Sequence, residues 1–104
     1  GITRRVYEEL TRTPGQFPDI DAIAERLCMT SRTLRRKLEA EGTSYSELLT
    51  SVRKALAIDY LGTTTLSTED IALTLGFSDA VGFRHAFKRW TGTTPSDVRR
   101  KRGK

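Results

Sequence analysis

The sequence predicts an all-α protein, and three features of its 104 residues lead to this prediction. Apolar residues recur at spacings of three, four and seven, as they do along one face of an α-helix. Residues that favour helix starts and stops separate these apolar stripes from one another. No stretch shows the alternation of apolar and polar residues that marks a half-buried strand. The chain is therefore expected to be helical almost throughout.

The first three helices are predicted from capping residues and apolar stripes. Residues 3–12 form the first helix. Asp19 is a suitable N-cap for the second helix, because its carboxylate can accept a hydrogen bond from a backbone N–H of the first turn. Thr30 or Ser31 caps a third helix, which ends near Gly42. The apolar stripe of the second helix consists of Ile20, Ile23, Ala24 and Leu27.

A longer helix is predicted in the middle of the chain. Ser44 and Glu47 have the spacing of a capping box, and the helix that they open continues to Leu61. A helix of 18 residues, from 44 to 61, is about 27 Å long. The stretch "GTTT" at 62–65 ends it. Its apolar face consists of Tyr45, Leu48, Leu49, Val52 and Leu56.

Three more helices are predicted in the C-terminal part. Ser67 and Asp70 form a box-like cap at the start of the first. The second extends over 80–91. Thr94 caps the last helix, and Pro95 occupies its first position, where a missing N–H removes no helical hydrogen bond.

Two of these segments repeat. The stretch "IAERLCMTSRTLRRKL" at 23–38 matches "IALTLGFSDAVGFRHAF" at 71–87, and the second copy is one residue longer in the turn. Each copy contains a short helix, a tight turn and a second helix with an apolar stripe. This is the pattern of a helix-turn-helix.

The second helix of each copy has an apolar face and a polar face. In the first copy Leu34 and Leu38 face the core, and a mainly basic set lies opposite. Arginine can pair with guanine O6 and N7 through two parallel hydrogen bonds, or with a phosphate. Each set alone could equally be a solvated charged face; the repetition at matching helical phase favours DNA recognition. The first set is Arg32, Arg35, Arg36 and Glu39, and the second is Val81, Arg84, His85 and Lys88.

The spacing of the two copies also fits DNA. Successive major grooves on one face of B-DNA recur about every 34 Å. A connecting helix of about 27 Å can therefore hold two recognition helices in adjacent grooves.

Composition excludes several other functions. The net charge is +5, and eight of the basic residues lie in 84–104, which favours a polyanionic partner. No apolar run has the length of a membrane span, and no secretory signal is visible. Cys28 is the only cysteine and is interpreted as a small residue in a turn, not as a nucleophile or metal ligand. Gly1 in place of an initiator methionine suggests a fragment.

The sequence resembles the DNA-binding domain of the AraC/XylS family of bacterial transcription regulators. The resemblance covers about residues 5–100. Three stretches carry it, namely "IAERLCMTSRTLRRKLEAEGTSYSELL", "RKALAIDYL" and "IALTLGFSDAVGFRHAFKRWTGTTPSDVRR".

The resemblance implies a seven-helix fold and a function. Two helix-turn-helix subdomains, at about 3–43 and 62–104, are joined by the central helix at 44–61. Sequence-specific binding of double-stranded DNA in the bacterial cytoplasm is implied, most often by an activator, without a cofactor, metal or enzyme activity. RNA polymerase and a companion effector-binding or dimerisation domain, absent from this chain, are the implied protein partners.

The resemblance also assigns candidate contacts by position. Base contacts are expected from Arg32, Arg35, Arg36, Val81, Arg84 and His85. Phosphate contacts are expected from Ser31, Lys37, Ser78, Ala80, Lys88 and Thr94. Two residues depart from the family pattern: Cys28 replaces the usual turn glycine, which Gly76 keeps, and His85 stands where arginine is frequent. The second copy is therefore expected to read fewer bases or to bind more weakly.

Three alternative functions remain compatible with the sequence. The chain could be a nucleoid-type DNA binder with little sequence preference. It could be the DNA-binding regulatory portion of a fused multidomain enzyme. A helical protein-docking module is the third, although the segregated charge disfavours it.

Trp90 continues the apolar face of 80–91 and is predicted to belong to the core.

Overall fold

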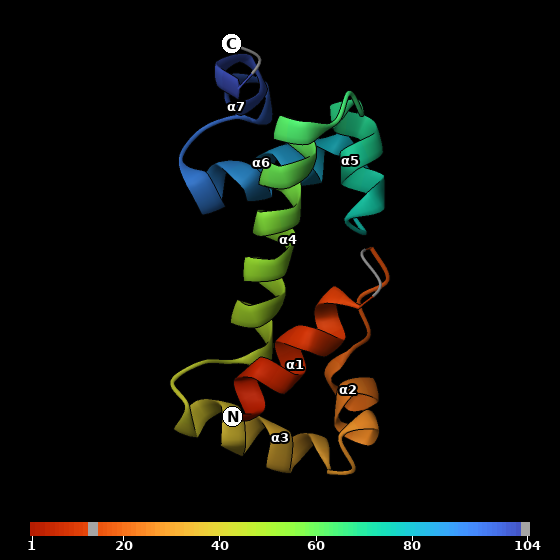
Figure 1. Cartoon of the computed structure of the whole chain (residues 1–104), viewed down its shortest axis with the longest axis vertical. Coiled ribbons are helices and arrows are strands. Elements are labelled where there is room, and N and C mark those ends of the chain that lie inside the picture. The colour runs from red at the N-terminus through yellow and green to blue at the C-terminus, as the bar shows by residue number, and fades with distance from the viewer. Residues whose placement is uncertain (13–14, 103–104) are drawn as a thin grey trace. The chain divides into compact units, whose positions relative to one another are not determined.

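The computed structural model describes residues 1–12 and 15–102, and its regular structure is helical throughout that part of the chain. Seven helices and no strand occur in these residues, and Figure 1 labels the helices. Their bounds are α1 (Ile2–Thr11), α2 (Ile20–Arg26), α3 (Ser31–Ala40), α4 (Tyr45–Thr63), α5 (Thr68–Thr74), α6 (Ala80–Thr91) and α7 (Pro95–Arg102). The all-α prediction is confirmed.

The chain divides into two compact units, residues 1–52 and 53–104, and the division falls inside α4. The first unit contains α1, α2, α3 and the first turns of α4. The second contains the remainder of α4 with α5, α6 and α7. Each unit has its own buried residues.

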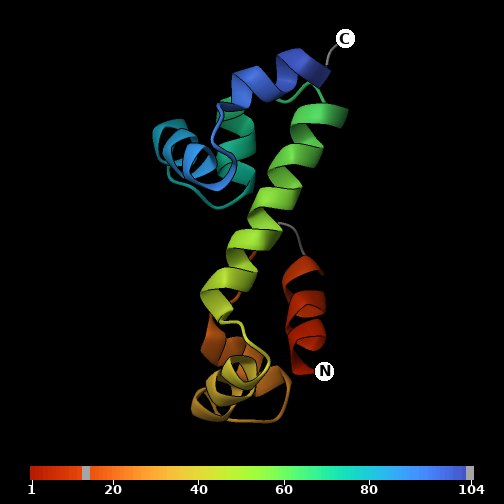
Figure 2. The same ribbon diagram turned by 90° about the vertical axis from the view of Figure 1, so that its left-hand side faces the viewer.

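The first unit is assembled around the apolar stripes of its helices. α3 contacts both α2 and α1, and these three helices gather around the beginning of α4 (Figure 2). Asp19 caps α2 as predicted, since its Oδ1 accepts a hydrogen bond from the Ala22 N–H at 2.9 Å. The buried apolar residues are Ile2, Val6, Leu10, Ile23, Ala24, Leu34, Leu38, Leu48 and Val52.

A carboxylate from the end of α3 caps the start of α1. Glu41 accepts hydrogen bonds from the backbone N–H of Ile2 at 3.0 Å and of Thr3 at 2.9 Å. These donors have no partner within their own helix, and the positive end of the helix dipole favours a negative charge there. The nearby Thr3 hydroxyl, followed by the two backbone N–H groups, lowers the pKa of Glu41 to about 2.

The second unit has an aromatic core. Phe83 lies 5.6 Å from Phe77 and 5.8 Å from Phe87 between ring centroids, in tilted arrangements. Trp90 lies 6.1 Å from Phe77 and packs against the buried cluster, so its predicted place in the core is confirmed. The buried members of the cluster are Ala57, Leu61, Ile71, Ala72, Leu75, Ala80, Phe83 and Phe87.

Arg99 joins α7 to the end of α4. Its guanidinium donates hydrogen bonds to the carbonyl oxygens of Leu61 and Tyr60, both at 3.4 Å, and of Thr64 at 3.2 Å. It also donates to the carbonyl of Leu66 in the following segment. The last carbonyls of a helix lack helical partners, and Arg99 donates hydrogen bonds to more than one carbonyl at the end of α4.

The predicted helix bounds agree with the observed ones to within a few residues. Thr30, not Ser31, caps α3, because its Oγ1 accepts from the Thr33 N–H at 3.2 Å. Thr94 caps α7 with Pro95 at its first position, as expected. The sequence pattern predicted no N-cap for α6. Asp79 is the N-cap, because its Oδ1 accepts a hydrogen bond from the Gly82 N–H at 3.0 Å.

Candidate nucleic-acid interface

The two helix-turn-helix segments share one turn geometry. In the first, Cys28 has φ 59° and the Met29 N–H bonds the Ala24 carbonyl at 3.0 Å. In the second, Gly76 has φ 89° and the corresponding bond joins Phe77 to Ala72 at 2.9 Å. A left-handed residue followed by this return bond ends a helix and reverses the chain. Cys28 is thus in the turn, as predicted, and it is exposed.

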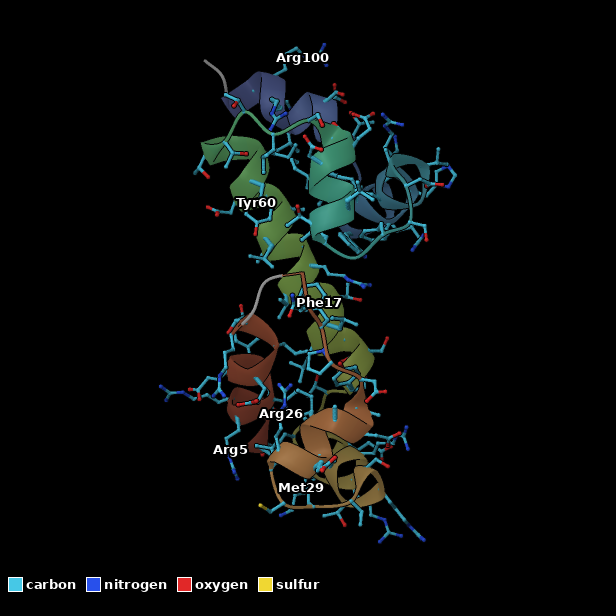
Figure 3. The ribbon with its side chains drawn as sticks, turned by 90° about the vertical axis from the view of Figure 1, so that its right-hand side faces the viewer. Arg5, Phe17, Arg26, Met29, Tyr60 and Arg100 are labelled. Carbon is cyan, nitrogen blue, oxygen red and sulfur yellow. The ribbon has the colours of Figure 1, made fainter. Side chains whose placement is uncertain are left out.

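The polar face of α3 is basic and unengaged. Leu34 and Leu38 are fully buried beneath it. Arg32, Arg35 and Arg36 are exposed, and within the described residues none of the three forms an ion pair or side-chain hydrogen bond. Their guanidinium donors are therefore available to an external acceptor. The turn that leads into α3 is marked by Met29 in Figure 3.

The polar face of α6 differs from that of α3. Val81 is 55% exposed, and His85 is exposed as well. The Arg84 Nη2 lies 3.1 Å from the Glu69 Oε1 of α5, and the two side chains are 49% and 63% exposed. Arg84 is therefore already partly engaged, whereas its counterpart by alignment, Arg35, is not.

The six candidate phosphate contacts fall into three groups. Lys37, Lys88 and Ser78 are exposed, and Ser31 is half-buried at the first position of α3. The Thr94 hydroxyl oxygen accepts from the Asp97 N–H at 3.1 Å, and the same hydroxyl lowers the pKa of the Asp97 carboxyl, so its proton is directed at Asp97. The methyl group of Ala80 is only 8% exposed and belongs to the core. A phosphate contact by Ala80 therefore has to use its backbone N–H.

Two ion pairs near these faces were not foreseen from the sequence. Glu69 and Arg84 are fifteen residues apart. The Arg26 guanidinium of α2 lies 3.4 Å from the Glu9 carboxylate of α1, so Arg26 points toward α1 (Figure 3). Glu9 also pairs with Arg12 of its own segment at 2.8 Å. Helical periodicity identifies the face on which a residue lies but not its partner on another helix. No local signal identified these pairs.

Two other kinds of feature, a metal-ligand cluster and a membrane-spanning helix, are absent from the described residues. No group of three or more potential metal ligands occurs among residues 1–12 and 15–102. In the same described residues, none of the helices combines the length and the apolar character that crossing a membrane requires.

A duplicated helix-turn-helix with one exposed, polar face per copy defines a nucleic-acid-binding type of domain. A family model described as a helix-turn-helix domain matches residues 23–101. The ornithine utilization regulator of Pseudomonas aeruginosa is 48% identical over 99 residues, which are 95% of this chain and 29% of that protein. The chain belongs to the AraC-type helix-turn-helix transcription regulators.

Solved structures give the same assignment. The transcriptional regulator CdpR from Pseudomonas aeruginosa superimposes with a TM-score of 0.90 at 41% identity, over 96% of this chain and 32% of that chain. The DNA-binding domain of AdpA, a global transcriptional factor solved in complex with a target DNA, superimposes with a TM-score of 0.81 at 28% identity. That match covers 96% of this chain and 90% of the AdpA domain.

Proposed function

We propose that this chain is the DNA-binding domain of a bacterial transcription regulator and that it binds double-stranded DNA with sequence specificity. The observation that carries the proposal is the repeated recognition face. α3 and α6 each bury an apolar side in a core and present polar, hydrogen-bonding side chains on the opposite side. The AdpA domain, similar over nearly its whole length, is bound to a target DNA, which supports the proposal.

In this proposal α3 and α6 each enter a major groove. The base-contacting residues are Arg32, Arg35, Arg36, Val81, Arg84 and His85. The working parts of the domain are the two helix-turn-helix subdomains, at about 3–43 and 62–104, and the connecting helix at 44–61. α4 has 19 residues and is about 28 Å long, which is comparable to the spacing of about 34 Å between successive grooves.

A footprint tests this arrangement. A high-affinity duplex is first selected from a random pool, and its backbone is then cleaved in the presence of saturating protein. We expect two protected segments on one face of the duplex, with centres about 10 bp apart. Protection of a single segment would remove one of the two helices from the proposed interface. Similar affinity for the selected and a scrambled duplex would favour the alternative of a nucleoid-type binder.

The remaining parts of the proposal concern the whole regulator. The chain spans 29% of the length of the ornithine utilization regulator, so a companion domain for an effector or for dimerisation is proposed, not observed. We propose that the domain is not an enzyme, acts in the cytoplasm, and works with RNA polymerase as an activator. A reporter gene with the selected site upstream of a weak promoter tests the last point: expression should rise, and a fall would indicate a repressor.

A further inference from the structure

One candidate base contact is held by an acid of the same unit. Arg84 of α6 pairs with Glu69 in the first turn of α5, at 3.1 Å between Nη2 and Oε1. α5 and α6 contact each other over buried residues, including Ile71 and Phe83. The packed core therefore sets the distance between the two backbones, and the ion pair follows from it.

The first unit contains the same arrangement without the pair. Aligning the two Ile-Ala dipeptides places Asp21 opposite Glu69, and aligning the following helices places Arg35 opposite Arg84. Aspartate is one methylene shorter than glutamate. Within the described residues Asp21 and Arg35 form no ion pair. The chain thus supplies its own control for the pair.

An arginine paired with a carboxylate offers DNA less charge but keeps most of its donors. The phosphate backbone attracts net positive charge whatever the sequence, and a carboxylate beside the guanidinium opposes that attraction. A base edge carries no net charge, so the same carboxylate opposes it much less. Only Nη2 of Arg84 is bonded to Glu69, which leaves Nε and Nη1 to donate to base acceptors.

We propose that Glu69 is a specificity-determining residue of the second unit, because its pair with Arg84 weakens sequence-independent phosphate attraction more than it weakens base recognition. This inference rests on the proposed function. Glu69 itself acts through Arg84 and is a positioning residue.

The test compares Glu69→Gln with Asp21→Asn in this chain. Both variants raise the net charge by one at matched positions, but only Glu69→Gln releases an arginine. Affinity is measured at several salt concentrations on the selected duplex and on one scrambled in the half-site read by α6. For Glu69→Gln we expect affinity for the scrambled duplex to rise by up to about eightfold at 0.1 M salt and its salt slope to steepen by about 0.9. Affinity for the selected duplex should change less, so discrimination falls.

The control variants isolate the cause. Asp21→Asn should leave discrimination as in the unaltered chain, and Glu69→Gln in an Arg84→Ala background should behave like Asp21→Asn. Equal effects of Glu69→Gln on both duplexes would overturn the inference, as would equal effects of the two single variants. The proposed function fails separately, namely if the unaltered chain does not distinguish the selected duplex from one scrambled over its whole length. Unchanged thermal unfolding shows that Glu69→Gln leaves the fold intact.

Discussion

The two helix-turn-helix segments make the same turn with different residues at its left-handed position. Cys28 has φ 59° and Gly76 has φ 89°, and the return hydrogen bonds after them differ by only 0.1 Å, at 3.0 and 2.9 Å. Left-handed backbone is unfavourable for a residue with a Cβ. The packing of the helix pair therefore determines the conformation, and the side chain at the turn adapts to it.

The recognition faces differ more than the turns do. Three arginines of α3 have no side-chain partner among the described residues, whereas Arg84 of α6 is paired with Glu69. Arg36 corresponds to His85 in the alignment of the two copies. A neutral imidazole has one donor, and a guanidinium has five. The scaffold is thus repeated, while the unpaired guanidinium groups of the two faces are concentrated in the first copy.

The largest expected effect lies on α3. Arg32→Ala or Arg36→Ala should weaken binding to the selected duplex by about 1–3 kcal/mol and relax the preference at one or two base positions. The matched change Arg84→Ala should have a smaller effect, because Arg84 is already paired. Binding to a panel of single-base variants measures both quantities. If the α3 variants keep full discrimination, α3 is not the reading helix.

Lys37 provides a contrast on the same helix. It lies beside the buried Leu38 and Leu34 and away from the arginine face, so a phosphate is its expected partner. Lys37→Ala should weaken binding to all duplexes about equally and reduce the salt slope by about 0.9. A change in base preference would place Lys37 at a base edge instead.

His85→Arg should make the second face more like the first. The variant adds a permanent positive charge, and we expect up to about an eightfold gain in affinity at 0.1 M salt, with a salt slope steeper by about 0.9. Titrations of the selected and scrambled duplexes at two salt concentrations measure the change. A loss of discrimination without this gain would mean that His85 makes a base-specific bond that arginine cannot reproduce.

A smaller effect is expected at the turn. Cys28→Gly should raise the free energy of unfolding by about 1 kcal/mol, because relief of the left-handed strain exceeds the entropy that glycine loses on folding. Gly76→Cys is the reverse change in the other copy and should destabilise by a similar amount. Urea unfolding measures both. A less stable Cys28→Gly variant would show that the first turn carries no strain.

Each unit has a contact between helices that are distant in the sequence, and we expect acid to weaken the contact of the first unit. Glu41 has a pKa lowered to about 2 from an ordinary 4.5. Its contact with the start of α1 therefore stabilises the folded state above pH 4.5 and is lost as the pH falls toward 2. The corresponding contact of the second unit, from Arg99 of α7 to carbonyl oxygens at the end of α4, involves no carboxylate.

Unfolding at several pH values tests this difference. Glu41→Gln should be less stable than the unaltered chain at neutral pH, and the two should converge as the pH approaches 2. Glu39→Gln is the matched control, since the Glu39 side chain forms no hydrogen bond or ion pair in the described residues. A constant difference between Glu41→Gln and the unaltered chain over this pH range would contradict a role for the carboxylate charge.

The features that sequence reasoning predicted are those that act over short distances. Asp19, Ser67 and Thr94 each bond an N–H three residues away, so their caps are visible in the sequence. The stripes of α3 and α6 follow from periodicity for the same reason. The candidate contacts remain predictions.

Long-range features could not be predicted from such patterns. The Glu41 cap joins residues 38 and 39 positions apart, and the Glu69–Arg84 pair depends on how α5 packs on α6. The burial of Ala80 is another effect of packing that the pattern did not give. The family resemblance assigns it a phosphate contact, which stays a prediction, and packing directs its side chain into the core.

The role of Arg99 has a consequence for synthesis on the ribosome. The carbonyl of Leu66 receives the Arg99 hydrogen bond from 33 positions later in the chain, and that of Leu61 from 38 positions later. The polypeptide emerges from the N-terminal side at about 5–20 residues per second. The first unit can therefore fold while the end of α4 is still without its partner, and the second unit completes its fold only after residue 99 has left the exit tunnel.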